Sequence, residues 1–185
     1  MTTRIYVSRD ATALAFGADA VARAITTEAQ KRNIDVTVVR TGSRGMFWLE
    51  PLVEVDAPAG RVAYGPIKPA DVGALFDAAF ERGAVHGLRV GIIEELPFFK
   101  NQERLTFARV GITDPLSVDD YRLHGGWRGL ENALSMTPED IVKAVTDSGL
   151  RGRGGAAFPA GIKWKTVLGT ESRSEEHTSE LQSLV

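Results

Sequence analysis

The residues most suited to chemistry lie between positions 149 and 164. This stretch holds five glycines interleaved with Arg151, Arg153 and Lys163. Glycine accepts backbone angles that other residues avoid, and it lets the chain approach a ligand closely. Consecutive N–H groups in such a loop can converge on an anion, and a nearby cation adds a point charge. The stretch therefore predicts a site for a phosphate group or a phosphorylated cofactor.

The P-loop is the first phosphate motif to compare with this stretch. It requires adjacent glycine and lysine, followed by serine or threonine. Here Ile162 separates Gly161 from Lys163, and Trp164 follows the lysine. The sequence is therefore not a P-loop.

The dinucleotide-binding fingerprint G-x-G-x-x-G/A is met literally by residues 152–157. That motif has to follow a strand and open a helix. Residues 137–140 instead indicate the start of a preceding helix, with Thr137 as N-cap, proline next and an acid at the third position. Gly149 stands where a C-terminal glycine cap belongs. We therefore reject the dinucleotide-binding interpretation.

The glycine-rich stretch resembles the flavin-binding loop of the NADH-oxidising flavoprotein subunit of respiratory complex I. The same subunit recurs in NAD-dependent formate dehydrogenases and NAD-reducing hydrogenases. Residues 98–104, 111–115 and 121–134 resemble that family too, so the likeness runs from about residue 97 to residue 170. A long ordered match of this kind is more specific than a lone glycine motif.

The resemblance implies a role for six residues. Four of them match the loop that wraps FMN: Gly152, Arg153, Gly154 and Gly155. Lys163 matches the lysine that approaches the flavin phosphate, and Phe158 matches an aromatic that stacks near the nicotinamide-nucleotide site. From the residues alone, we would favour a solvated surface charge for Lys163 and a buried packing residue for Phe158.

The composition indicates an ordinary globular chain. Its 185 residues are 43% hydrophobic and 25% charged, with a net charge of −2. This excludes the basic excess of a nucleic-acid-binding protein. No apolar run approaches the roughly 20 residues that span a bilayer. The first residues enter a strand without the apolar segment of a signal peptide, so we expect a cytoplasmic location.

The N-terminal half reads as β-α-β-β-β-α. We expect strands at residues 5–7, 36–39, 52–55 and 61–64, the last two forming a hairpin. A helix capped by Asp10 presents an apolar face: Leu14, Ala18, Val21, Ile25 and Ala29. A second helix begins at Pro69, ends at Gly83 and turns five residues inward: Val72, Leu75, Phe76, Ala79 and Phe80. This order predicts a small α/β domain with the thioredoxin-like fold.

That half resembles the thioredoxin-like [2Fe-2S] domain of the partner subunit of the same enzymes, which holds its cluster with C-x4-C and C-x3-C pairs. The chain has no cysteine. Ser8 and Ala13 occupy the positions of the first pair, and Ser43 and Phe47 those of the second. Alanine and phenylalanine cannot ligate iron, so we predict no [2Fe-2S] cluster here. The apolar run at residues 46–49 is either an exposed contact patch or a plug in the local core.

Four segments follow from these patterns. We expect a thioredoxin-like domain at 1–92, a connecting helical segment at 93–136 and the start of an FMN- and NADH-binding domain at 137–172. Residues 173–185 resemble the in-frame translation of a common sequencing-library adapter, so we expect a non-native tail on a truncated chain. The resemblance implies that relatives continue into the rest of the pocket and to cysteines that bind a [4Fe-4S] cluster. We expect the fragment to bind FMN weakly or not at all.

The function implied by the resemblance is electron transfer between NAD(H), FMN and iron–sulfur centres. A thioredoxin-like domain without cysteines, fused to such a flavoprotein, most resembles the diaphorase subunit of a soluble formate dehydrogenase. The alternatives are the diaphorase subunit of an NAD-reducing hydrogenase and a non-catalytic docking module. The expected partners are other subunits of a multi-subunit NAD-linked dehydrogenase. We assign no catalytic or metal-binding residue within this chain.

Overall fold

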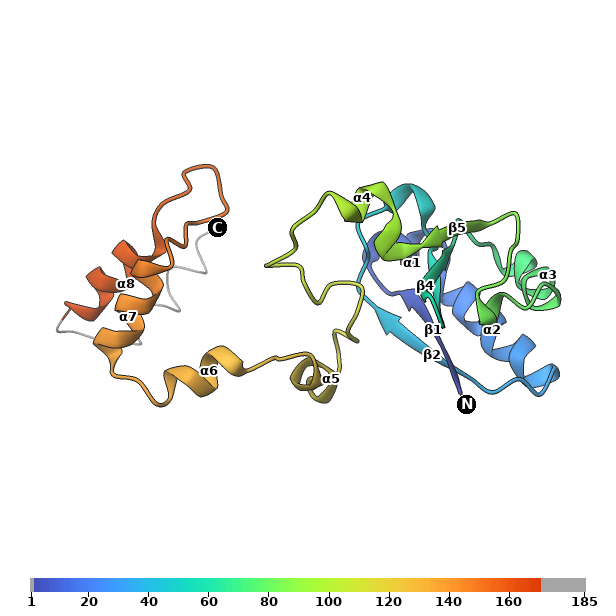
Figure 1. Cartoon of the computed structure of the whole chain (residues 1–185), viewed down its shortest axis with the longest axis horizontal. Helices are drawn as coiled ribbons and strands as arrows, with labels where there is room; N and C mark the ends of the chain where they lie inside the picture. The colour runs from blue at the N-terminus through green and yellow to red at the C-terminus, as the bar shows by residue number, and fades with distance from the viewer. Residues whose placement is uncertain (1, 171–185) are drawn as a thin grey trace, which may run out of the picture. The chain divides into compact units, whose positions relative to one another are not determined.

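The computed structural model describes residues 2–170 of the chain. Contacts within it separate two units, with the division between Gly125 and Gly126. The first unit carries the β-sheet, and residues 126–170 of the second form helices and no sheet (Figure 1). The boundaries that we predict at residues 92 and 136 remain a proposal beside this division, and residues 173–185 lie outside the described part.

The first unit is built on one five-stranded sheet. Its strands, in spatial order, are β2 (Val36–Thr41), β1 (Thr3–Ser8), β3 (Val53–Ala57), β4 (Gly60–Tyr64) and β5 (Arg89–Ile92). The pair β1–β2 is parallel, and the other three pairs are antiparallel. Helix α2 (Ala18–Lys31) connects β1 to β2, and α3 (Val72–Asp77) follows the β3–β4 hairpin. This β-α-β and β-β-α order confirms the predicted thioredoxin-like fold.

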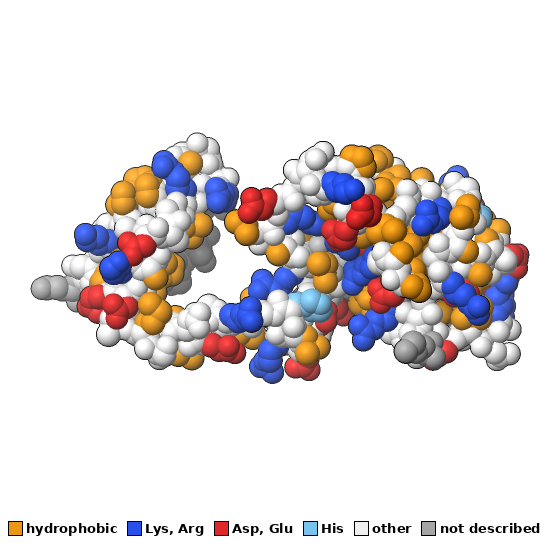
Figure 2. All heavy atoms as spheres, viewed as in Figure 1, with side chains coloured by type: hydrophobic (Ala, Val, Ile, Leu, Met, Phe, Trp, Pro, Cys, Tyr) orange, Lys and Arg blue, Asp and Glu red, His pale blue; other side chains and the backbone are white. Residues whose placement is uncertain are grey.

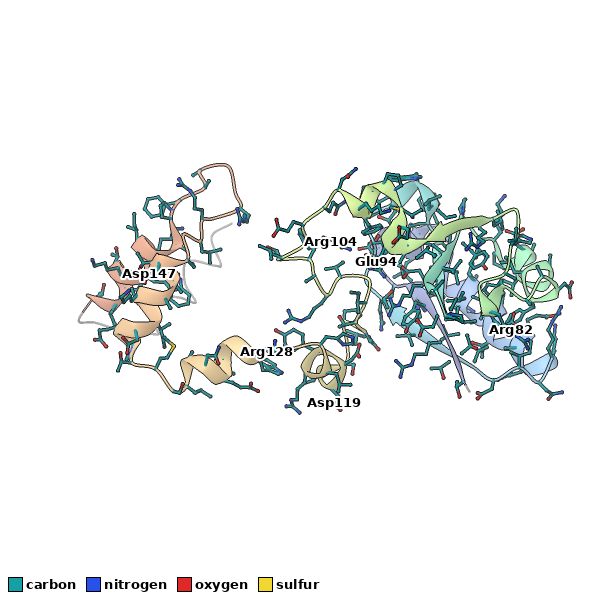
Figure 3. The ribbon with its side chains drawn as sticks, viewed as in Figure 1. Arg82, Glu94, Arg104, Asp119, Arg128 and Asp147 are labelled. Atoms are coloured by element: carbon teal, nitrogen blue, oxygen red, sulfur yellow. The ribbon has the colours of Figure 1, made fainter. Side chains whose placement is uncertain are left out.

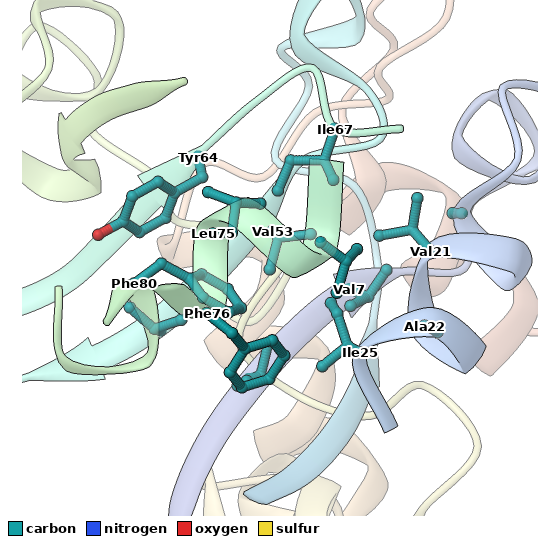
Figure 4. Close-up of a cluster of buried hydrophobic side chains, with 14 of the residues drawn as sticks. Val7, Val21, Ala22, Ile25, Val53, Tyr64, Ile67, Leu75, Phe76 and Phe80 are labelled. Carbon is teal, nitrogen blue, oxygen red and sulfur yellow. The ribbon is translucent and has the colours of Figure 1, made fainter. Parts of the chain in front are cut away.

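One face of the sheet packs against α2 and α3 in the main hydrophobic core (Figure 4). Side chains alternate along a strand, so every second residue of β1, β3 and β4 reaches this face. Apolar residues spaced three or four apart on the helices pack against this face. The fully buried members include Val7, Val21, Ile25, Val53 and Leu75. The periodicities that predict these elements therefore also predict their buried faces.

The first predicted helix is in fact two. Asp10 caps α1 (Ala11–Ala15) as expected, its carboxylate accepting the N–H of Thr12 at 3.0 Å. The chain then breaks at Gly17, whose φ of 95° lies in the left-handed range, before α2 begins. The expected burial of Leu14 is wrong, because its side chain is 42% exposed. Because of this break, α1 does not continue the apolar face of α2, and Leu14 does not reach the core.

The second predicted helix is also interrupted. It consists of the 3₁₀ turn η2 (Pro69–Asp71), α3 and the 3₁₀ turn η3 (Phe80–Arg82). Ala79 carries a positive φ of 57° and is only partly buried, so it is less buried than the predicted inward position requires. Gly83 ends the segment in the left-handed conformation, as predicted.

Strand β5 has no counterpart among the predicted elements. It has only four residues, and Gly91 within it adopts a φ of 138°. Its pairing with β4 shifts register between Ala63 and Tyr64. A short strand that contains glycine gives almost no alternating pattern.

The second face of the sheet carries charge. Tyr6, Glu54 and Ala63 lie opposite one another across β1, β3 and β4, and so share this face. Arg44 lies in the loop after β2 and donates two parallel hydrogen bonds to the Glu54 carboxylate, of 2.9 and 2.8 Å. The two side chains are 2% and 5% exposed. A forked pair of this kind neutralises both charges in a buried place that water does not reach.

A small apolar cluster lies beside this ion pair: Met46, Leu52, Ala63, Ile93 and Phe99. It decides between the two interpretations of residues 46–49. Met46 is buried in the cluster, whereas Phe47 and Trp48 in the 3₁₀ turn η1 (Phe47–Leu49) are 51% and 63% exposed. The run is therefore part core plug and part exposed surface.

The remaining elements are short helices. They are η4 (Ile93–Glu95), α4 (Pro97–Lys100), α5 (Val118–Leu123), α6 (Arg128–Ala133), α7 (Pro138–Asp147) and α8 (Ala160–Leu168). Within residues 126–170 only Gly126 and Gly161 are buried, so the second unit has no closed core in the described part. None of the helices between residues 2 and 170 is both long and apolar enough to cross a bilayer.

Removing one partner of the Arg44–Glu54 pair is expected to lower the free energy of unfolding by about 3–5 kcal/mol, because the other charge stays buried. Arg44→Met and Glu54→Leu each test this in the full chain by urea denaturation followed by circular dichroism. The double variant removes both charges and should be much less destabilised than the sum of the two. Arg122→Met is the matched control, since Arg122 is exposed and 3.8 Å from Asp119. Additive losses would contradict the pairing.

Candidate functional site

The glycine-rich stretch forms a closed loop between α7 and α8. Residues 151–159 are drawn together at the base by an isolated bridge between Arg151 and Pro159. The N–H of Gly152 donates to the carbonyl of Phe158 at 2.8 Å, and the N–H of Ala160 donates to the carbonyl of Leu150 at 2.8 Å. These two bonds fix both ends of the loop and leave its tip free to meet a ligand.

The helix before the loop begins and ends as predicted. The Thr137 hydroxyl accepts the N–H of Asp140 at 3.2 Å, with Pro138 in the first turn. Gly149 follows the helix with a φ of 66°. Figure 3 labels Asp147 at the C-terminal end of α7. The G-x-G-x-x-A pattern therefore follows a helix, which confirms that it is not a dinucleotide-binding turn.

Arg151 turns back onto its own loop. Its Nε donates to the carbonyl of Ala157 at 2.8 Å. Ala157 has a φ of 44°, a conformation that costs a non-glycine residue free energy unless its surroundings hold it. Arg151 is therefore a clamp on the loop, which the sequence did not predict. Arg153 forms no hydrogen bond or ion pair within residues 2–170, so its charge remains available.

The glycines of this region divide into two kinds. A Cβ added to Gly161 would stand 2.5 Å from the Thr146 hydroxyl and 2.7 Å from the Thr146 Cα, so Gly161 allows α7 and α8 to pack. A Cβ added to Gly154 or Gly155 would meet nothing within 4 Å, and neither has a φ in the left-handed range. Chain geometry alone does not require glycine at these two positions. Their bare backbone leaves room for a ligand to approach.

The tip of the loop presents unpaired donors. In the described part of the chain, the backbone N–H groups of residues 153–156 donate to no protein acceptor. Helix α8 begins beside them at Ala160, with Pro159 as an N-cap that makes no side-chain hydrogen bond. The N–H of Ala160 is already bonded to Leu150, whereas those of Gly161 and Ile162 have no acceptor in the described part of the chain. Such donors, together with the positive end of a helix, favour an anion.

An open pocket of about 420 Å³ lies against this loop. It is lined by Gly152, Gly154, Gly155, Ala156, Ala157, Phe158, Ala160 and Lys163. The structure thus brings five of the six sequence-predicted residues to one pocket, and Arg153 is on the same loop but does not line it. Lysine and arginine side chains gather over this loop (Figure 2).

Phe158 and Lys163 stand together on the pocket wall. The Lys163 ammonium lies 5.8 Å from the centre of the Phe158 ring, within the range of a cation–π contact. Phe158 is 44% exposed, so it is not the buried packing residue of the alternative interpretation. Its ring is available to a ligand that enters the pocket.

A second groove of about 540 Å³ runs between α7 and α8. Its lining carries no charged side chain: Pro138, Ile141, Val142, Trp164, Val167, Leu168 and Thr170. Such a lining offers no positive charge to a phosphate. The glycine loop, not this groove, is therefore the candidate binding site.

The four positions that the resemblance assigns to cluster ligands lie in the first unit, and three of them are buried or hydrogen-bonded there. Ala13 is fully buried in the main core, and Phe47 is half exposed. The Ser8 hydroxyl accepts the N–H of Asp10 at 3.2 Å, beside the start of α1. Among residues 2–170, no three carboxylate or imidazole side chains come together in a way that suits a metal ion.

Ser43, at the remaining position, forms a hydrogen bond with the buried carboxylate of Glu50. Its hydroxyl donates to Glu50 Oε1 at 3.0 Å, while the N–H of Leu52 donates to Glu50 Oε2 at 2.9 Å. Burial raises the pKa of Glu50 above its usual value, and the two hydrogen bonds act in the opposite direction. The loop after β2 is therefore closed by hydrogen bonds around one buried acid.

Comparison with known proteins gives a partial match of high identity. No protein-family profile matches the chain. It is 49% identical over 73 residues to the HndC subunit of the NADP-reducing hydrogenase of Solidesulfovibrio fructosivorans, covering 40% of this chain and 15% of that protein. It is 53% identical over 51 residues to the F subunit of the NADH-quinone oxidoreductase of Streptomyces coelicolor, covering 28% and 11%. Over these segments the chain is similar to these oxidoreductase subunits. It spans 15% or less of the length of either.

Two solved structures show weak overall likeness. The thioredoxin-like [2Fe-2S] ferredoxin of Aquifex aeolicus aligns with a TM-score of 0.42 and 22% identity, over 49% of this chain and 97% of that one. An NAD⁺-reducing [NiFe]-hydrogenase aligns with a TM-score of 0.36 and 17% identity, over 92% of this chain and 28% of that one.

Substitution by alanine is expected to affect the two kinds of glycine differently. Gly161→Ala places its methyl group inside Thr146 and should loosen the contact between α7 and α8, whereas Gly154→Ala should leave it unchanged. Amide hydrogen exchange of α7 and α8 in the full chain measures this. The prediction fails if Gly154→Ala raises exchange in the helices as much as Gly161→Ala does.

Glu50 should make stability depend on pH. Because its pKa is higher in the folded chain than the roughly 4.3 of an unfolded glutamate, folding favours the protonated form. This contribution is complete below the unfolded pKa and is lost as the pH rises through the folded pKa. Glu50→Gln stays neutral, so its stability relative to the parent should be greater at pH 7 than at pH 4.

Urea denaturation at the two pH values, followed by circular dichroism, measures the Glu50 effect. Glu131→Gln is the matched control, because Glu131 is exposed on α6 and should give the same small difference at both. An equal Glu50→Gln difference at pH 4 and pH 7 would rule out the buried titration.

Proposed function

We propose that the chain carries the FMN-binding loop of an NAD(H)-oxidising flavoprotein subunit, which passes electrons between NAD(H), FMN and iron–sulfur centres. The observation that carries this proposal is the row of unpaired N–H groups at residues 153–156 beside the uncapped start of α8. The homology to the hydrogenase and NADH-quinone oxidoreductase subunits supports it. Since the chain spans a small part of those relatives, the activity belongs to a larger protein.

The residues of the loop fit a flavin phosphate. The free N–H groups, the N-terminus of α8 and the Lys163 ammonium supply donors and positive charge on one side of the pocket. Gly154 and Gly155 let the backbone approach without a side chain between it and the ligand. Phe158 offers an aromatic surface for a flat ring. Bound FMN would supply the conversion between two-electron chemistry with NAD(H) and one-electron transfer.

In that reaction, the role of this chain is to position the bound flavin. Arg151 holds Ala157 and so fixes the shape of the loop tip. No residue of the pocket lining is a histidine or a carboxylate that would serve as a general acid or base. Hydride transfer requires orientation of the two reacting rings more than proton transfer by the protein. Among the described residues the pocket is open on one side, and we propose that the opposite wall comes from another part of the protein.

The assembly is proposed as a soluble, cytoplasmic NAD-linked dehydrogenase of several subunits. We propose formate dehydrogenase as the enzyme, following the fusion of a cysteine-free thioredoxin-like unit to the flavin loop. The second candidate is an NAD-reducing hydrogenase, favoured by the identity to a hydrogenase subunit. A [4Fe-4S] cluster would lie in a part of the protein outside this sequence, and no [2Fe-2S] cluster is proposed in the thioredoxin-like unit.

A titration of the chain with FMN tests the loop directly. Amide NMR shifts of residues 153–156 should move with FMN and move less with riboflavin, which lacks the phosphate. Half-saturation should lie above the micromolar range, because a pocket with one open side buries little of the ligand. Lys163→Ala should weaken the FMN response severalfold, whereas Lys165→Ala should not, since only Lys163 lines the pocket.

Two outcomes would count against the proposal. If the loop amides stay still in millimolar FMN while the helical amides keep their folded shifts, the flavin site is refuted. The non-catalytic docking module, supported by the exposed Phe47 and Trp48 of the first unit, would then be favoured. Saturation below micromolar FMN would refute the expectation that this part of the site is incomplete.

A further inference from the structure

The segment after α4 runs over the charged face of the sheet. The Arg61 Nη1 donates to the carbonyl of Gly111 at 3.0 Å. A Cβ added to Gly111 would collide with the Arg44 side chain and stand 2.7 Å from its Nε, so the backbone passes directly over that side chain. The φ of Gly111 is 79°, which favours glycine here for a second reason. We call residues 104–125 the strap.

The two arginines that hold the strap are themselves fixed. Arg44 is locked to Glu54 by its forked hydrogen bonds. The Arg61 guanidinium lies 3.4 Å from the centre of the Tyr6 ring and 3.6 Å from the Glu54 carboxylate. The Tyr6 hydroxyl in turn donates to Asp56 at 2.9 Å. The strap therefore rests on a rigid platform of side chains from three strands and one loop.

The beginning of the strap is attached to the same platform. Phe99 is buried, and the Arg104 guanidinium lies 5.1 Å from the centre of its ring, with Arg44 at 5.7 Å from that centre. Glu94 pairs with Arg44 at 3.3 Å, and Figure 3 shows Glu94 and Arg104 on this side of the first unit. The Phe99 ring thus lies close both to Arg44 of the platform and to the first residue of the strap.

The end of the strap is closed by Arg109. Its Nε donates to the carbonyl of His124 and its Nη2 to the carbonyl of Gly125, both at 2.8 Å. Gly125 has a φ of 75° and Trp127 one of 68°, so the chain changes direction here. The division between the two units falls at this same point.

We propose that the strap is an integral part of the thioredoxin-like unit and that the joint of the chain lies at Gly125–Gly126. The thioredoxin-like unit then connects to the glycine-loop unit through a short joint instead of a long flexible linker. Motion between the units is rotation about a few backbone bonds, as in other hinges. This inference stands whether or not the loop binds FMN.

Hydrogen exchange of the full chain tests the strap. In the parent, strap amides with backbone acceptors, such as Ile112 and His124, should be protected together with β1 and β3. Gly111→Ala strains the backbone and collides with Arg44, so it should speed exchange in the strap about tenfold or more while the strands keep their protection. Gly73→Ala is the matched control, because a Cβ there meets nothing within 4 Å.

A milder variant separates release of the strap from loss of the fold. Arg61→Met keeps the aliphatic stem but cannot donate to Gly111, so it should speed strap exchange in the same direction by a smaller factor. Strap amides that exchange freely in the parent, or that stay equally protected in both variants, would overturn the proposal. Brief trypsin digestion of the parent locates the joint. Among the trypsin sites from Arg104 to Arg128, cleavage should come first at Arg128, and earlier cleavage at Arg104 or Arg122 would overturn the proposal.

Discussion

The first unit depends on the buried pair between Arg44 and Glu54. Placing two charges under a sheet is costly, and only a forked contact with both charges matched makes it tolerable. Once the pair is in place, the second face of the sheet cannot be covered by an ordinary apolar helix. It is covered instead by chain that offers carbonyl groups and glycine, as Gly111 does toward Arg61. The ion pair thus decides which segment can pack there.

The two units differ in how complete they are. The thioredoxin-like unit has a closed core on one side of its sheet and an ionic platform on the other. The helical unit buries no large side chain within residues 126–170. Its loop is nevertheless shaped, because the bonds at Gly152 and the Arg151 clamp are local. The proposed binding loop therefore takes its shape from local hydrogen bonds and does not depend on a core in residues 126–170.

Local signals were enough to predict much of this structure. The alternating strands, the β3–β4 hairpin and the Thr137 cap each depend on residues near one another in the chain. The break at Gly17 and the short strand β5 were missed, because one glycine or four residues carry little periodic signal. The Arg44–Glu54 pair joins a loop to a strand, and no pattern marks it. In the candidate site, the residue types predicted a loop suited to an anion, whereas no pattern marks the hydrogen bond from Arg151 to Ala157.

The glycines of the loop show what a structure adds to a motif. Glycine is costly in a folded chain because it loses the most backbone freedom. Gly161 offsets that cost by allowing two helices to touch, and Gly149 by ending one. Gly154 and Gly155 have no such role in the described chain, since a methyl group at either would enter open space. Under the proposed function, glycine there leaves room for a ligand that approaches the loop from outside. The free N–H groups at the same positions suit an anion.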